Sequence, residues 1–232
     1  MKLFRITYLF ILLSFSAFAK DSTKVEFKRF AFGIHASPDY CFRSLSGEGS
    51  TYKFKNSIEE PMYGYSAGAD FSYFFKKKFA ISLGIGFTQK GYQTIAFTLT
   101  GANGMSLGTT KFRYNYNYIE VPLKASLFLG KKNVHLVPSI GVTPAFMLYE
   151  QTLSKYEYNN GSNSSKKGQP NYIYNPFNLF INGSVGVDFK LGESMGLKIE
   201  PTYSYGLLTT LDSYMTEKLW SAGLNVGWDI GF

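Results

Sequence analysis

The C-terminal segment alternates between apolar and polar residues almost without interruption. From Trp220 to Phe232 the chain reads WSAGLNVGWDIGF. The apolar positions of this segment are Trp220, Ala222, Leu224, Val226, Trp228, Ile230 and Phe232. A period of two is the pattern of a β-strand with one apolar and one polar face. Because the apolar face carries large aliphatic and aromatic side chains, the segment predicts a strand that faces lipid on one side and a polar lumen on the other.

Seven earlier segments carry related patterns and complete a set of eight predicted strands. The eight strands are 30–40, 63–75, 79–97, 114–128, 134–149, 177–190, 196–207 and 219–232. The sequence therefore predicts an all-β fold, an antiparallel up-and-down transmembrane β-barrel, with eight strands as the first interpretation. Ten strands are compatible with the same pattern, because the long third strand and the first loop have room for another hairpin.

The connections between these strands alternate in length. The long connections are 42–62, 98–113 and 150–176, the intermediate one is 208–218, and the short ones are 76–78, 129–133 and 191–195. Membrane barrels have short periplasmic turns and longer external loops, so both termini are expected in the periplasm. The longest connection is rich in Asn, Gly and Ser between Tyr156 and Gly168, which predicts a mobile loop without a packed core.

Charged residues in the strands indicate which face lines the lumen. In 114–128, Ile119 and Leu123 share one face, and Glu120 and Lys124 share the other. A lysine facing lipid near the midplane would cost ~2–4 kcal/mol, so the charges are expected to point inward. The predicted lumen polar network consists of Asp70, Lys90, Glu120, Lys124, Asp188, Lys198, Glu200 and Asp229. Because the signs are mixed and eight strands enclose a narrow interior, we expect an ion-paired lumen filled by side chains, with Glu120 and Lys124 as a local pair.

Aromatic residues make up 18% of the chain, which fits aromatic girdles at two membrane interfaces. Trp220, Trp228 and Phe232 are the predicted membrane-interface aromatics. Eight residues of tilted strand separate the two tryptophans, which corresponds to roughly 20 Å along the membrane normal.

The N-terminal 19 residues have the pattern of an export signal. Lys2 and Arg5 precede an apolar stretch, and Ala17-Phe18-Ala19 forms a small-x-small cleavage motif. The expected organisation is a cleaved signal peptide at 1–19 and an outer-membrane β-barrel domain at 20–232. The localisation predicted from this is the cell outer membrane.

The remaining composition excludes several kinds of chemistry. The formal charge of +8 gathers in turns such as Lys76–Lys78, which we interpret as solvated, and no nucleic-acid-binding motif is present. Cys41 is the single cysteine, so no intrachain disulfide can form. The chain has two histidines, His35 and His135, and neither is expected at the external rim, where a catalytic set of a small barrel would lie. No catalytic, cofactor or metal site is predicted.

The mature chain resembles the PorT-like family of small outer-membrane β-barrel proteins. The resemblance spans about 32–232 and is based on Gly33-Ile34-His35-Ala36, on Gly84 and Gly86, and on Tyr118-Ile119-Glu120-Val121-Pro122-Leu123-Lys124, with the terminal Phe232. It implies a barrel of eight or slightly more strands, an outer-membrane location and export by a signal peptide. Most members have no assigned activity, and one branch is tied to protein secretion.

Four functions are compared, of which the fourth, a rim-located lipid enzyme, would require an activity that is lost when His35 and His135 are replaced. The first is a non-enzymatic barrel whose external loops, above all 42–62 and 150–176, serve structure or interaction. The second is an accessory subunit of an outer-membrane transport or protein-secretion complex. The third is a soluble lipocalin-like barrel, which would need apolar residues inside and polar residues outside. The expected partners are the lipid bilayer and proteins that contact the external loops, with no nucleic acid; the sequence does not set the oligomeric state.

Overall fold

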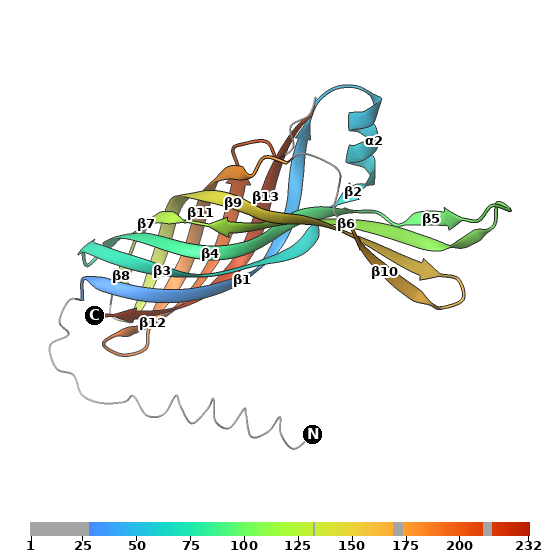
Figure 1. The fold of residues 1–232 in the computed structure, drawn as a ribbon. Coiled ribbons are helices and arrows are strands. Elements are labelled where there is room, and N and C mark those ends of the chain that lie inside the picture. The colour runs from blue at the N-terminus through green and yellow to red at the C-terminus, as the bar shows by residue number, and fades with distance from the viewer. Residues whose placement is uncertain (1–27, 132, 169–173, 211–214) are drawn as a thin grey trace, which may run out of the picture.

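The computed structural model describes residues 28–131, 133–168, 174–210 and 215–232, and it is a closed antiparallel barrel (Figure 1). The predicted signal peptide lies outside the described residues. The elements are β1 (Phe30–Ser46), α2 (Ser50–Ile58), β2 (Glu59–Glu60), β3 (Met62–Lys76), β4 (Phe79–Thr94), β5 (Phe97–Thr100), β6 (Ser106–Glu120), β7 (Leu123–Leu127), β8 (Leu129–Lys131), β9 (Val134–Tyr158), β10 (Asn163–Gly168), β11 (Phe177–Lys190), β12 (Met195–Gly206) and β13 (Thr216–Gly231).

Eight strand positions form the ring, which confirms the predicted fold. The order is β1, β3, β4, β6 with β7, β9, β11, β12 and β13, and β13 closes the ring by pairing with β1. β6 and β7 are one strand position, since both pair with β4 and β9. The interruption falls at Val121 and Pro122, because proline has no backbone N–H to donate to a neighbouring strand.

The outer surface of the barrel is apolar along every strand. Ile85 on β4 is 61% exposed, Ile140 on β9 is 62% exposed and Leu224 on β13 is 46% exposed. In each strand, the residues that alternate with these outward-facing positions point inward. This arrangement confirms the predicted alternation and is the reverse of the lipocalin-like alternative. In the described part of the chain, no helix is long and apolar enough to cross a bilayer.

Aromatic side chains collect at both ends of this apolar surface. Towards the external end, ring contacts link Tyr63, Tyr40, Trp220 and Tyr203 across four strands. At the other end, Phe232 contacts Phe30 and Phe71 at 6.2 and 6.1 Å between ring centroids. Two such bands are expected where a barrel wall meets the lipid headgroups.

Trp228 faces outward between these two bands, opposite Ile34 and Leu197. Placement of Trp220, Trp228 and Phe232 at the membrane interfaces stays a prediction.

The predicted external loops are more ordered than the sequence suggested. β1 continues six residues beyond its predicted end at Tyr40, and the first connection contains α2 and β2. The segments 98–113 and 150–176, assigned to connections from the sequence, both contribute strands. A strand outside the membrane needs no apolar face, so these segments lack the alternation of apolar and polar residues that marks the barrel strands.

These strands form a four-stranded sheet that extends beyond the barrel, in the order β5, β6, β9 and β10 (Figure 1). We call it the projecting sheet and define it as β5, 106–113 of β6, 153–158 of β9, and β10. β6 and β9 run through both the barrel wall and the projecting sheet, so the two parts share a continuous backbone.

Candidate functional site

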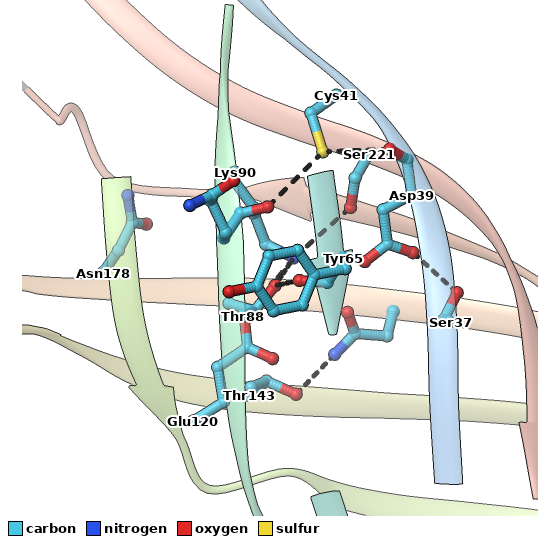
Figure 2. A network of polar contacts seen from close by, with 12 residues as sticks. Ser37, Asp39, Cys41, Tyr65, Thr88, Lys90, Glu120, Thr143, Asn178 and Ser221 are labelled. Atoms are coloured by element: carbon cyan, nitrogen blue, oxygen red, sulfur yellow. Dashed lines mark hydrogen bonds and ion pairs between the residues drawn. The ribbon is translucent and has the colours of Figure 1, made fainter. Parts of the chain in front are cut away.

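The middle of the lumen holds a buried lysine surrounded by polar groups. Lys90 is 3% exposed, and its Nζ lies 3.4 Å from Glu120 Oε1. The ammonium also donates to the hydroxyls of Thr88 and Ser221, at 3.4 and 3.3 Å (Figure 2). Its remaining side lies 5.0 Å from the ring centroid of Phe180, where the π face attracts a cation. Each side of this buried charge therefore meets a group that offsets its desolvation.

A second group of charges lies nearer the periplasmic end. Lys124 Nζ is 3.1 Å from Glu200 Oε2, and the amide of Asn225 donates to the same oxygen at 3.4 Å. Lys198 Nζ is 2.8 Å from Asp229 Oδ2. Glu200 is 1% exposed and Lys198 is 8% exposed, so both pairs are shielded from bulk water.

The carboxylates Asp70 and Asp188 each lie beside a histidine. Asp70 Oδ2 is 3.9 Å from His35 Nδ1, and Asp188 Oδ2 is 3.8 Å from His135 Nδ1. Asp188 is fully buried and also pairs with Lys190, at 3.1 Å. All eight charges named from the sequence thus have an ion-pair or histidine partner, although the pairing differs in one case.

The predicted local pair between Glu120 and Lys124 was wrong. Glu120 pairs with Lys90 on β4, and Lys124 pairs with Glu200 on β12. The reason is the interruption of the strand at Val121 and Pro122, which separates the two residues into β6 and β7. The first of these pairs joins the neighbouring strands β4 and β6, and the second crosses the lumen from β7 to β12.

Large side chains close the external half of the lumen. Tyr92, Tyr116, Tyr118, Phe180 and Leu219 form a buried cluster there, each 6% exposed or less. Below this cluster a space of about 140 Å³ remains, lined among others by His35, Asp70, Lys90, Glu120 and Asn225. Sequence reasoning assigned small residues to the interior and missed this aromatic layer.

An ion cluster at the external mouth was also missed. Arg43 pairs with Glu59, which follows α2, and with Glu217 on β13, and its guanidinium carbon lies 3.6 Å from the ring centroid of Tyr92. Tyr116 donates its hydroxyl proton to Glu217 at 3.1 Å. Arg43 and Glu217 continue the inward alternation of β1 and β13, so extending that pattern past the predicted strand ends would have found them.

Glu150 lies at the same mouth, beyond the membrane-spanning part of β9. Burial raises the pKa of this carboxyl to about 8, and the nearby hydroxyl of Tyr174 only partly offsets the effect. A neutral Glu150 is therefore the form that the folded mouth favours at neutral pH.

Catalytic groups do not meet at the external rim of the described structure. His35 and His135 both point into the lumen beside carboxylates, and Cys41 is fully buried. No group of three or more metal-ligating side chains occurs among the described residues.

Several solved structures are similar in shape. Neisserial surface protein A is 13% identical, with 88% of this chain and 97% of that chain covered and a TM-score of 0.45. The N-terminal β-barrel domain of OprF from Pseudomonas aeruginosa is 14% identical, with 88% and 100% covered and a TM-score of 0.41. The outer membrane protease OmpT from Escherichia coli is 6% identical, with 92% and 99% covered and a TM-score of 0.40.

No curated protein matches the chain. The family described as "Outer membrane protein beta-barrel domain" matches residues 14–212, which is most of the sequence. The match agrees with the eight-stranded ring, the apolar wall and the polar lumen. The chain belongs to the outer membrane protein β-barrel domain family.

Proposed function

We propose that this protein is a non-enzymatic outer-membrane barrel with a closed lumen, and that its external part serves interaction. The observation that carries the proposal is the pairing of charges inside the lumen, in one case across it, beneath a layer of buried tyrosines. A solute pathway would need those charges to face water instead of one another.

Conductance in planar lipid bilayers tests the closed lumen. The wild-type protein is expected to show only a small leak, and a stable large-conductance state would contradict the proposal. The double variant Tyr116→Ala/Tyr118→Ala removes two fully buried rings and should raise conductance. The matched control Tyr156→Ala/Tyr158→Ala removes two rings from the projecting sheet and should leave conductance unchanged.

The absence of an enzymatic role is supported by the positions of the two histidines. Both lie inside the barrel next to Asp70 and Asp188, so neither activates a nucleophile at the rim. Activity towards a lipid or peptide substrate that is lost in His35→Gln or His135→Gln, with the barrel still folded, would overturn this part of the proposal.

A specific observation also favours a second candidate, the accessory subunit of a larger outer-membrane complex. Within the described residues, β5 pairs only with β6 and β10 pairs only with β9, so each has one edge that could pair with a strand from another protein. Photo-crosslinking from β10 in intact cells tests this candidate. A reproducible protein adduct would support it, and lipid adducts alone would count against it.

The finer family assignment and the export route are parts of the same proposal. The PorT-like resemblance of Tyr118–Lys124 supports that branch of small outer-membrane barrels. Cleavage after Ala19 predicts that the mature protein begins with Lys20, and N-terminal sequencing of the protein from outer membranes tests this directly.

A further inference from the structure

One face of the projecting sheet carries a group of cations. Lys111 on β6 lies directly opposite Lys155 on β9, and Arg113 occupies the next position of β6 on the same face. Like charges directly opposite each other destabilise a strand pair. The arrangement therefore has an energetic cost in the free protein that a bound anion would remove.

Protein carboxylates neutralise these cations only in part. Lys111 pairs with Glu60. Arg113 instead donates to two neutral acceptors, the side-chain oxygen of Asn115 and the backbone carbonyl of Tyr63. Lys155 is exposed, and no carboxylate lies within ion-pair distance of it among the described residues. Lys167 of β10 and Glu157 lie on the same face. The face therefore carries four cations, Lys111, Arg113, Lys155 and Lys167, and two carboxylates, Glu60 and Glu157, which leaves an excess of two positive charges.

The cations surround a hollow in the sheet surface. Its lining includes Lys111, Arg113 and Lys155 together with Gln93, Thr109 and Glu157, and its volume is about 210 Å³. A hollow with three cationic groups and two neutral polar side chains has the donors that a phosphate group needs. The guanidinium of Arg113 can supply two parallel N–H donors to phosphate oxygens.

The position of the hollow indicates where its ligand comes from. Lys111 and Arg113 precede Ile119 on β6 at even spacing, so they lie on the face that continues the lipid-facing wall. Tyr65, Asn117 and Tyr149 lie at the same height on this wall, and both tyrosines are half exposed. With ~3.3 Å per residue and a tilt of ~40°, Arg113 lies roughly 10 Å beyond that level, which is where the headgroups of the outer leaflet begin.

We propose that this face of the projecting sheet binds the phosphate-bearing headgroup of an outer-leaflet glycolipid. Lys111, Arg113 and Lys155 hold the phosphate, and the side-chain amide of Gln93 and the hydroxyl of Thr109 border the space for the attached sugar. The bound headgroup relieves the repulsion between the two opposed lysines and fixes the projecting sheet against the membrane surface.

Native mass spectrometry of the full-length protein in uncharged detergent tests the proposal. The protein is titrated with diphosphoryl lipid A and, separately, with the same lipid after removal of both phosphates. The expected result is a preference of about tenfold or more for the phosphorylated lipid. No preference for the phosphorylated form would overturn the proposal.

The variant Lys111→Gln/Arg113→Gln/Lys155→Gln should lose most of this preference, because its three donors to phosphate lose their charge. The control Lys76→Gln/Lys77→Gln/Lys78→Gln removes the same number of positive charges from the turn at the opposite end and should keep it. Unchanged phosphate preference in the first variant, or an equal loss in the control, would overturn the proposal.

A second variant covers the case in which the triple variant fails to fold. Lys155→Glu changes one exposed side chain, and a retained heat-modifiable gel band shows that its barrel is closed. This variant should also lose the phosphate preference. Inorganic phosphate and heparin are added in separate competition arms, and full displacement of lipid A by either one at equal phosphate or sulfate concentration would assign the hollow to a soluble anion.

Discussion

The barrel wall and the projecting sheet are built from the same strands, yet different forces hold them. In the wall, β6 and β9 turn apolar side chains to lipid and polar ones to a closed lumen, where the eight charges predicted from the sequence have partners. The projecting sheet lies outside the hydrocarbon core of the membrane, and cross-strand pairing fixes its register. A change of solvent along one continuous strand therefore changes which substitutions the protein tolerates.

The largest expected difference concerns a single ion pair in each region. Lys90→Met should destabilise the barrel by about 3–5 kcal/mol, because it leaves Glu120 without its buried partner. Lys111→Met breaks the exposed pair with Glu60 and should cost at most about 1 kcal/mol. Denaturant unfolding in detergent micelles measures both effects.

Removing the charge of Glu120 as well as that of Lys90 tests whether the unpaired carboxylate causes the loss of stability. In Lys90→Met/Glu120→Gln neither charge remains, so a large part of the lost stability should return. Equal costs for the two lysine variants would mean that the lumen is as hydrated as the external surface.

A lysine introduced at an outward-facing position should be costly where the surface meets lipid and tolerated where it lies outside the membrane. Ile140→Lys places a charge in the middle of the lipid-facing part of β9 and should cost about 2–4 kcal/mol. Leu107→Lys, on an exposed position of the projecting sheet, should change stability by less than about 0.5 kcal/mol. Folding yield in lipid vesicles is the measurement, and similar yields for the two variants would argue against lipid contact at Ile140.

Close approach of strands gives a third contrast. A Cβ on Gly68 would lie 2.7 Å from the carbonyl oxygen of Ile85 and 3.0 Å from the Cα of Gly86, so backbone would have to move. Gly68→Val should therefore destabilise the barrel by about 1–3 kcal/mol, whereas Gly183→Val, where no atom lies within 4 Å, serves as the matched control. The heat-modifiable band should disappear at a lower temperature only for the first variant.

The last contrast depends on pH, because it concerns a titrating group at the external mouth. Because burial raises the pKa of Glu150 from about 4.5 to about 8, its contribution to stability is present below pH 4.5 and is lost as the pH rises through 8. Glu150→Gln should raise the melting temperature at pH 9 and leave it nearly unchanged at pH 5, with a gain of about 1–3 kcal/mol at the higher pH. Glu157→Gln, exposed on the same strand, should show neither change.

Much of the wall could be predicted from the sequence because lipid and lumen impose opposite demands on neighbouring residues. The alternation from Trp220 to Phe232 and the inward phase of Lys124 follow from that contrast, and the structure agrees with both. The partner of Lys124 could not be predicted, since it depends on which strands face each other across the lumen. Glu120 pairs with Lys90 on the neighbouring strand β4, a cross-strand pair that sequence reasoning along one strand missed.

The external part was harder to predict because its strands lie outside the hydrocarbon core of the membrane. Segments such as Asn163–Gly168 contain only exposed residues, so the pattern that distinguishes a strand from a loop is absent. The hairpin forms through backbone pairing of β10 with β9, which leaves little mark on residue type. The same holds for the cations of Lys111, Arg113 and Lys155, whose proximity depends on register across two strands.

Spin labels along β13 test the central claim that one face of the barrel strands meets lipid and the other a closed lumen. Single cysteines at 224, 226 and 230, and at 225 and 229, are introduced into a Cys41→Ala background in lipid vesicles. Labels at the first three positions are predicted to collide with oxygen dissolved in the bilayer, and labels at 225 and 229 are predicted to be shielded from it. The opposite pattern, or equal accessibility of both sets to a water-soluble relaxation agent, would contradict the account.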